Sequence, residues 1–346
     1  MLKIYPNSLI YVHAPGDYST GGVELLHQLV DALRNHGRKA YIVYYGNDTQ
    51  TITKAYSHYN IEIKQNAEID DNFRNIEIYT ETNVKSLKKN VRKTQKMIWW
   101  LSVDNYYVSN ENHLGLYDMF VWDKRLAWGM FKHRLKRLLK FRKNEFIGNV
   151  SLVEFVLKGY SFGYQCEYIK SFLHKFGILK PLGLSDYINI DFVDKLKVIQ
   201  KRNRVLYNPS KGYKFTKRLM EIAPDIEWVP LKGYSREQLL EVISQAKLYI
   251  DFGNHPGKDR LPRECAMGRC CIITGMRGSA AYYKDLPIPS EYKFDESVID
   301  ISEVIKKIRS TLAHYDTAID DFAKYRNSIK MEKCVFEDEV MRIFSC

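Results

Sequence analysis

Short apolar runs alternate with stretches of helical periodicity along the chain, and this alternation is the strongest constraint on its fold. The apolar runs predict strands at residues 8–14, 40–45, 75–80, 96–103, 116–122, 204–207, 226–229, 248–252 and 271–274. Segments with a period of 3.6 separate several of them, and residues from 301 onward are helical in period. Repeated strand–helix units build parallel sheets covered by helices on both faces. The sequence therefore predicts an α/β protein.

Length and composition narrow the class. At 346 residues the chain is about twice a usual domain, so we expect two doubly wound domains joined near residues 183–192. No run approaches the ~20 apolar residues of a membrane span, and residues 1–14 do not form a signal peptide pattern. The six cysteines match neither a zinc site nor a disulfide scaffold, and Cys270 and Cys271 lie in an apolar run typical of buried thiols. We expect a cytoplasmic protein.

The positive charge is concentrated in one segment. Residues 124–143 hold nine lysines and arginines and no acid, which leaves +3 of the net charge of +12 for the rest of the chain. Trp128, Phe131, Leu135 and Leu138 recur at helical spacing in the same segment. Asp123 precedes it as a plausible N-cap. The pattern predicts a basic amphipathic helix.

Three interpretations of this helix are open. Its apolar stripe packs on the core and its cations are solvated; or it lies on an anionic inner-membrane surface; or it binds nucleic acid phosphates, which we disfavour because no nucleic-acid module accompanies it. The second makes the protein peripheral on the inner membrane face. The residues that would contact the membrane are Lys132, Arg134, Lys136, Arg137 and Lys140.

Two loops after predicted strands are suited to anions. Gly21 and Gly22 precede a helix, where backbone amides and the helix dipole attract negative charge. The pattern is not G-x-G-x-x-G and no acidic residue follows at the right distance, which disfavours a nicotinamide dehydrogenase. In the second half Ser210, Lys211 and Gly212 repeat the arrangement with a cation added. A tight turn or a solvated lysine explains either loop alone.

The densest polar signal follows the apolar run 248–252. Residues 251–264 hold several cations, two prolines, two glycines and a histidine, and end on Glu264 in the first turn of a predicted helix. Polar groups beside a core strand are costly unless they pair with each other or with a ligand. Charge-assisted hydrogen bonds here would hold a diphosphate, and Glu264 would accept from ribose hydroxyls. An internal ion-pair cluster of Asp259 with Arg260 or Arg263 is the alternative.

These loops resemble nucleotide-sugar glycosyltransferases of the GT-B fold, in particular those of bacterial capsule, O-antigen and related cell-surface polysaccharides. The resemblance is loose over the first domain and good over residues 204–295. It implies two Rossmann-like domains facing a cleft: an acceptor-side domain at 1–185, a nucleotide-sugar domain at 186–325 and a C-terminal helix at 326–346 that crosses back to brace the first. The residues that carry it are 20–24, 99–105, Lys211-Gly212, 251–264, Ala266, Gly268 and 272–275.

The resemblance also implies roles for single residues. Glu264 would contact the ribose, as the second glutamate of the E-x7-E pattern of retaining enzymes. Lys211 and Arg260 would neutralise the donor diphosphate, and Gly21 and Gly22 would close over it. The first glutamate of that pattern falls on Pro256, so His255 or Lys258 would occupy the space near the sugar. Together with Ser210 and Gly212 these residues form the expected donor site of a retaining enzyme.

The chemistry asks for cations where the diphosphate leaves, because negative charge builds there as the glycosidic bond lengthens. No convincing Asp-x-Asp pair is present, so we expect no metal and no cofactor beyond the donor. Asp104 and His13 are candidates to activate an acceptor hydroxyl; turn capping and a packed histidine are their alternatives. The expected acceptor is a glycan or a lipid-linked sugar. A non-catalytic nucleotide- or glycan-binding scaffold, which Pro256 motivates, is the second hypothesis; a nucleic-acid-binding protein is the third.

Overall fold

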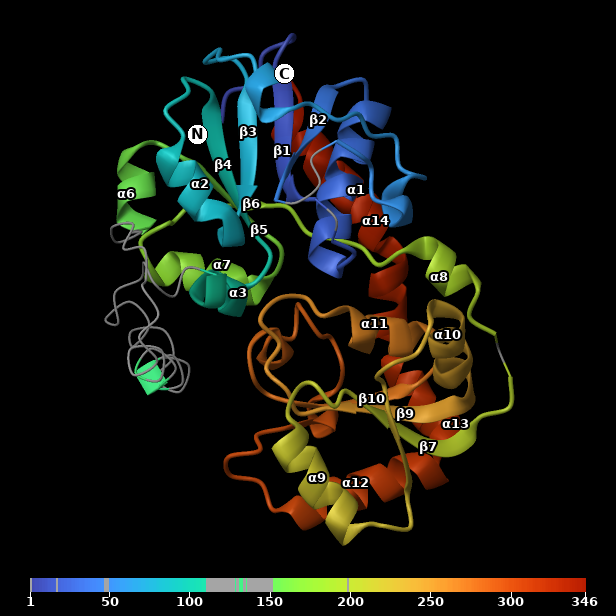
Figure 1. The fold of residues 1–346 in the computed structure, drawn as a ribbon. Helices are drawn as coiled ribbons and strands as arrows, with labels where there is room; N and C mark the ends of the chain where they lie inside the picture. The colour runs from blue at the N-terminus through green and yellow to red at the C-terminus, as the bar shows by residue number, and fades with distance from the viewer. Residues whose placement is uncertain are drawn as a thin grey trace. The chain divides into compact units, whose positions relative to one another are not determined.

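The computed structural model describes residues 2–16, 18–46, 50–109, 128, 131, 132, 135, 152–197 and 199–346. It divides into two compact units (Figure 1). Unit 1 holds residues 1–165, 169–185 and 336–346, and unit 2 holds residues 166–168 and 186–335. Each unit contains one parallel β-sheet, as the strand–helix alternation predicts.

Unit 1 is built on a six-stranded sheet of order β2-β1-β3-β4-β5-β6. Because β1 has β2 on one side and β3 on the other, the chain reverses its direction of winding there. The strands are β1 (Leu9–Pro15), β2 (Lys39–Tyr45), β3 (Ile76–Thr80), β4 (Gln95–Trp100), β5 (Ser161–Tyr164) and β6 (Leu182–Gly183). The helices are α1 (Gly21–Asn35), α2 (Val84–Lys89), α3 (Val103–Ser109), α6 (Leu152–Leu157) and α7 (Glu167–Lys175), whose first two residues belong to unit 2.

Unit 2 repeats the design with five strands in the order β11-β10-β9-β7-β8. The strands are β7 (Arg202–Tyr207), β8 (Glu227–Pro230), β9 (Ala246–Asp251), β10 (Cys271–Gly275) and β11 (Lys293–Phe294). The helices are α8 (Ile190–Asp194), α9 (Tyr213–Ile222), α10 (Arg236–Gln245), α11 (Arg260–Met267), α12 (Ile301–Ala313), α13 (Tyr315–Ala318) and α14 (Ala323–Phe344). Short 3₁₀ turns at Lys54–Tyr56, Asn66–Glu68, Glu81–Asn83, Ser279–Ala281, Ser290–Tyr292 and Ile319–Phe322 complete the two units.

Sequence signals explain several element ends. Ser235 caps α10 and exchanges hydrogen bonds with Gln238, so the predicted start of this helix is confirmed. Thr20 caps α1 through its side chain, directly before the two glycines of the first loop. Cys270 and Cys271 are free and fully buried, as their apolar surroundings predict. The predicted strand at 116–122 and most of the basic helix lie outside the described residues.

The last helix takes part in both units. α14 belongs to unit 2 through Val335 and to unit 1 from Phe336 onward. In unit 1 the buried Phe336 ring lies 6.4 Å from that of Trp99, and Glu339 accepts a hydrogen bond of 2.6 Å from the Ser185 backbone. The final eleven residues therefore complete the core of unit 1. Among the described residues, no helix has both the length and the apolar character that crossing a bilayer requires.

Candidate functional site

Two loops of unit 2 meet at the carboxyl edge of its sheet. Gly212, between β7 and α9, has φ +61°, and a Cβ there would lie 2.3 Å from the backbone carbon of Phe252. A Cβ on Gly253 would lie 2.3 Å from Cβ of Lys211. Only glycines permit this approach, so the sequence itself brings the loop of Lys211 against the loop that follows β9.

A chain of alternating charges runs through the two loops. Nζ of Lys211 lies 2.5 Å from Oδ2 of Asp259, which precedes α11. The same oxygen lies 3.4 Å from Nδ1 of His255, whose Nε2 lies 3.6 Å from Oδ1 of Asp251. Burial opposes a charge on His255, but Asp251 and Asp259 outweigh it and raise its pKa. Lys211 therefore sits at the solvent end of a buried relay.

Three side chains of this relay are of the kinds that bind metal ions. Asp251, His255 and Asp259 offer ligand atoms within 4.8 Å of one another. Both oxygens of Asp251, however, accept hydrogen bonds of 2.8 Å, from Tyr249 and from the Gly253 backbone. Lys211 already neutralises Asp259. Because an ammonium stands where a cation would bind, these residues fit a closed ion-pair relay better than a metal centre.

The other predicted donor residues lie at the start of α11. The helix already begins at Arg260, so Glu264 lies in its second turn and not in the first turn that the sequence predicted. Glu264 is buried, and its Oε1 lies 3.1 Å from Nη1 of Arg236 and 3.8 Å from Nε of Arg260. Arg236 stacks on Phe192 at 3.8 Å. Lys211, Arg260 and Glu264 thus gather around one helix terminus of unit 2. Arg236 also belongs to this group of residues, although the sequence did not predict it. Its position in the first turn of a helix does not indicate that it contacts Glu264.

His255 and Lys258 do not stand free for a ligand. His255 is buried in the relay, and Nζ of Lys258 lies 2.8 Å from Glu332 and 3.9 Å from Asp186. Those two carboxylates also hold Arg263, which is completely buried. Ser210 lies in a turn where its N–H donates to Asn208. The ion-pair alternative for the 251–264 loop therefore describes part of it, although Arg263 pairs with Asp186 and Glu332 and not with Asp259.

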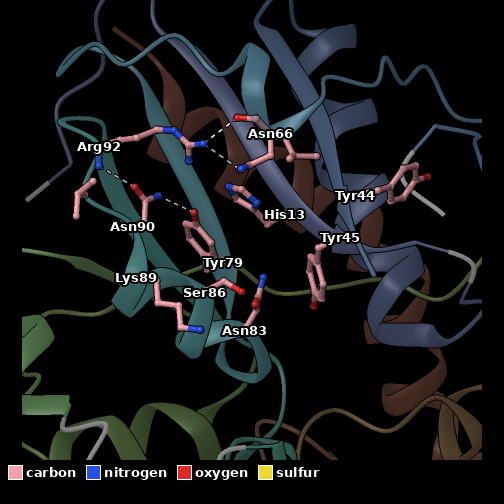
Figure 2. Close-up of a pocket in the computed structure, with 12 residues that line it drawn as sticks. His13, Tyr44, Tyr45, Asn66, Tyr79, Asn83, Ser86, Lys89, Asn90 and Arg92 are labelled. Carbon is pink, nitrogen blue, oxygen red and sulfur yellow. Dashed lines mark hydrogen bonds between the residues drawn. The ribbon is translucent and has the colours of Figure 1, made fainter. Parts of the chain in front are cut away.

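Unit 1 contains a separate pocket at the reversal point of its sheet. It has a volume of about 550 Å³ and is lined by the ends of β1 to β3, by α2 and by the loop after α2 (Figure 2). His13 lines it, 13 residues into the chain, together with Tyr45, Tyr79 and Asn83. In doubly wound sheets, ligands bind outside the carboxyl ends of the strands at such a reversal.

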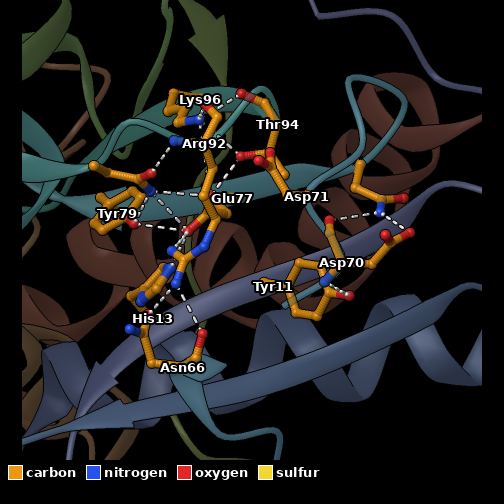
Figure 3. A network of polar contacts seen from close by, with 12 residues as sticks. Tyr11, His13, Asn66, Asp70, Asp71, Glu77, Tyr79, Arg92, Thr94 and Lys96 are labelled. Carbon is orange, nitrogen blue, oxygen red and sulfur yellow. Dashed lines mark hydrogen bonds and ion pairs between the residues drawn. The ribbon is translucent and has the colours of Figure 1, made fainter. Parts of the chain in front are cut away.

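Behind His13 lies a buried carboxylate that sequence reasoning missed. Glu77 is fully buried and accepts hydrogen bonds from His13 Nε2 at 2.9 Å and from Tyr79 at 2.8 Å (Figure 3). Arg92 lies 3.2 Å and Lys96 3.8 Å from it. Burial alone would raise the pKa of Glu77, but hydrogen bonds from His13, Thr94 and Asn90 outweigh it and hold the pKa well below its ordinary value. The sequence feature that could have revealed Glu77 is an acidic residue within the otherwise apolar strand β3.

This partner fixes the state of His13. Burial lowers the pKa of His13, so the ring is neutral at pH 7. Since Glu77 is ionised, the ring hydrogen is on Nε2 and the lone pair is on Nδ1. Nδ1 has no hydrogen-bond partner among the described residues. His13 is thus both packed, with its ring 4.0 Å from that of Tyr79, and able to accept a proton.

The remaining predicted residues of unit 1 lie near the starts of helices. Gly21 and Gly22 form the first turn of α1. Asp104 is partly buried in the first turn of α3, and Ser102 supplies the turn hydrogen bond by accepting from the Asn105 backbone at 3.1 Å. Glu81, which the sequence analysis also missed, follows β3 as the first residue of a 3₁₀ turn; burial raises its pKa to about 8.

Comparison with known proteins addresses the fold. No family model and no curated protein matches the chain. Solved structures do match over nearly its whole length. Anabaena HepE in complex with UDP-glucose has a TM-score of 0.57 and 10% identity, and the match covers 97% of this chain and 99% of that one. Sucrose-phosphate synthase from Thermosynechococcus elongatus has a TM-score of 0.57, 12% identity and 97% coverage of both chains.

The chain has the GT-B fold. The apo structure of OtsA is similar as well, with a TM-score of 0.57, 10% identity and coverage of 98% and 99%. The fold expectation of two doubly wound α/β halves is confirmed. In the GT-B frame, unit 1 is the N-terminal half with the His13 pocket, and unit 2 is the C-terminal half with the charged α11 terminus.

Proposed function

We propose that the chain is a glycosyltransferase that moves a sugar from a nucleotide-diphosphate sugar to a glycan or lipid-linked acceptor in cell-surface polysaccharide synthesis. The observation that carries the proposal is the gathering of Lys211, Arg260 and Glu264 around the start of α11, at the carboxyl edge of the unit 2 sheet. HepE, which shares the fold, is described in complex with UDP-glucose, and a mutant of S. aureus TarM, with a TM-score of 0.56, is described in a complex that includes UDP.

The charges of this site suit a leaving diphosphate. As the bond from the sugar C1 to the diphosphate oxygen breaks, the electron pair stays on that oxygen, and nearby cations stabilise it. Lys211 and Arg260 would supply this charge without a metal, and Lys211 would exchange Asp259 for the phosphate. Glu264 would accept from the ribose hydroxyls while Arg236 holds it in place. Gly21 and Gly22 would close over the donor from unit 1.

The acceptor hydroxyl needs a proton acceptor as its oxygen bonds to C1. His13 is our first candidate because it is neutral, oriented by Glu77 and has Nδ1 available. Asp104 is the second candidate. We propose a retaining outcome from the place of Glu264, although Pro256 stands where retaining enzymes of this type have their first glutamate.

Donor turnover tests this proposal. Lys211→Gln and Glu264→Gln should each lower sugar release from UDP-glucose, or from whichever nucleotide sugar a thermal-shift panel selects, by about 100-fold. Lys217→Gln, an exposed lysine on α9, is the matched control and should keep full activity. Normal turnover in both variants would refute the site.

The non-catalytic scaffold remains a second candidate because of Pro256 and because Lys211 is already paired with Asp259. It predicts binding of the nucleotide sugar with no turnover in any acceptor mixture. Calorimetry of UDP-glucose binding, run beside the turnover assay on the same protein, separates the two candidates.

We also propose that the basic segment binds an anionic membrane surface. Its described apolar positions are exposed: Trp128 by 53%, Phe131 by 37% and Leu135 by 48%. Lys132 lies over the Trp128 ring at 5.5 Å. Replacing Arg134, Lys136, Arg137 and Lys140 with glutamine should abolish salt-sensitive binding to phosphatidylglycerol vesicles. The same change at Lys214, Lys217, Lys306 and Lys330 is the control; equal loss in both would contradict the proposal.

A further inference from the structure

We propose that the His13 pocket of unit 1 binds the acceptor and selects one that carries a negatively charged group, a carboxylate, phosphate or sulfate. That the bound molecule is the acceptor of a sugar rests on the proposed function. The anion site itself is inferred from unit 1 alone. Three observations support the anion site: the charges of the pocket wall, the side-chain amide of Asn83, and the position of the pocket at the reversal point of the sheet.

The pocket wall has an excess of positive charge. Lys89 and Arg92 line it, and none of the described residues that line it is a carboxylate (Figure 2). Glu77, the carboxylate behind the wall, is fully buried and has two cations, Arg92 and Lys96, within 4 Å. Within 4 Å, one negative charge faces two positive ones, and the neutral His13 does not change this sum; Asp71 acts on Lys96 from farther away. Lys89 adds a further positive charge.

Lys89 is available to a ligand. It lies at the last turn of α2, is exposed, and forms no ion pair with any residue that the structure describes. Its neighbour Lys88 instead faces Glu154 at 3.6 Å. The two adjacent lysines thus have different surroundings: Lys89 lines the pocket and Lys88 does not.

Asn83 supplies the independent sign of a ligand. Asn83 is 6% exposed, and its Nδ2 has no hydrogen-bond partner among the residues that the structure describes. A buried N–H donor without a partner destabilises the fold, and an anionic oxygen in the pocket would remove this cost. Figure 2 places the Asn83 amide on the His13 side of α2, next to Ser86 and below Tyr45. Asn66 and Asn90 provide further amides on the wall.

The surroundings also suit a sugar ring. Tyr45 and Tyr79 present aromatic rings in the pocket, and Nδ1 of His13 is the available base. A sugar whose acidic group reaches Lys89 and Asn83 would keep its hydroxyls among tyrosines, amides and His13. A hydroxyl oxygen of a neutral sugar would also accept from Asn83, but a neutral sugar would leave Lys89 without a counter-ion.

Binding of simple sugars to the full chain tests the proposal in the absence of donor. Methyl β-D-glucuronide, glucose 6-phosphate and glucose 6-sulfate should each bind more tightly than methyl β-D-glucoside, by about tenfold or more in calorimetry or ligand-observed NMR. The three charged probes distinguish the kind of acid. Equal binding of the neutral glucoside would overturn the proposal.

Variants place the binding in the pocket. Lys89→Gln should weaken binding of the preferred charged probe by about fivefold to tenfold, whereas Lys88→Gln should leave it unchanged. Asn83→Asp should abolish it, because it adds a negative charge to the pocket. Asp is a favoured residue at a helix start and Asn83 precedes α2 without a capping bond, so the fold should persist, which circular dichroism checks. Equal effects at Lys88 and Lys89 would refute the assignment.

Parallel titration with UDP separates the two proposals. UDP binding should be unchanged in the Lys89 and Asn83 variants. Failure of UDP to bind the native chain, with the charged probe still bound, would overturn the proposed function and leave the anion site. UDP binding without selective binding of the charged probes would overturn the anion site and leave the proposed function.

Discussion

The two units bury charges of opposite sign, and they balance them differently. In unit 2 the buried centre is a cation: Arg263 donates to Asp186 at 3.0 and 2.6 Å and to Glu332 at 2.9 Å. Lys258 joins these carboxylates, so two positive charges meet two negative ones. In unit 1 the centre is the carboxylate of Glu77, and two cations outnumber it.

The difference separates a structural cluster from one beside a binding site. The neutral cluster of unit 2 joins α11 to Asp186, the first residue after unit 1, and to Glu332, just before α14 passes into unit 1. It holds the chain where it enters and leaves the unit. The cluster of unit 1 lies behind a pocket and keeps an unmatched positive charge. The buried Glu77 and Lys96 balance each other, so the excess charge belongs to the partly exposed Arg92, which lines the pocket and can pair there with an anion from outside.

The largest expected effect comes from removing the centre of the neutral cluster. Arg263→Met should destabilise unit 2 by about 3–5 kcal/mol, because Asp186 and Glu332 would remain buried without a guanidinium. Urea unfolding followed by peptide-resolved hydrogen exchange measures this for each unit. Arg309→Met, which breaks an exposed pair with Asp225, is the control. An equal, small effect of both changes would show that the cluster is not structural.

A smaller effect should follow from the centre of the other cluster. Glu77→Gln should destabilise unit 1 by about 2–3 kcal/mol, since Arg92 is partly exposed and can turn toward water while Lys96 cannot. The same exchange experiment reports it in β3 and β4. Glu62→Gln, at an exposed ion pair with Arg34, should change stability by no more than about 1 kcal/mol. Loss of exchange protection in unit 2 alone would contradict this prediction.

Acid should remove the difference between Glu77→Gln and the native chain. The pKa of Glu77 is held below its ordinary value of 4.5 in the folded state. The ionised carboxylate therefore contributes its full stability above about pH 4.5, and this contribution is lost as the pH falls below that value toward the folded pKa. Urea midpoints of unit 1 in both proteins, measured from pH 7 to pH 3, should converge on the acid side. A constant gap over that range would mean that Glu77 is not ionised.

The smallest effect is expected at Lys211. It is about one third exposed, and its pair with Asp259 lies at the surface end of the relay. Lys211→Gln should therefore change the stability of unit 2 by less than about 1 kcal/mol, although we expect it to lower donor turnover by about 100-fold. Thermal unfolding of this variant beside Lys217→Gln checks it. A loss of several kcal/mol would assign Lys211 to the fold and not to the site.

Much of the fold followed from the sequence because parallel strands are continuous apolar runs. The runs at 40–45, 204–207 and 271–274 correspond to β2, β7 and β10 within one or two residues at each end. The strands β5, β6 and β11 escaped prediction. β5 and β6 contain glycines, and β6 and β11 are two residues long, so their apolar periods are too short to recognise.

The site was harder to predict than the fold. Polar crowding in residues 251–264 marked the right loop, but pattern alone could not say which cations pair internally. Lys258 faces the Arg263 cluster because Asp186 and Glu332, far away in sequence, are folded against it. Glu77 and Asn83 were not predicted for the same reason. The hydrogen bonds of Glu77 and the absence of one at Asn83 Nδ2 among the described residues are set by the folded structure.

The passage of α14 from one unit to the other has a consequence for synthesis of the chain. Phe336, Val340 and Phe344 are buried in unit 1, and Arg38 donates a hydrogen bond to the Phe344 carbonyl. A ribosome makes these residues only after all of unit 2. The N-terminal sheet must therefore wait, with Trp99 incompletely covered, until translation has passed residue 344, and a fragment that stops at residue 185 should need chaperones or aggregate. Joining residues 336–346 to such a fragment through a designed linker should restore its solubility.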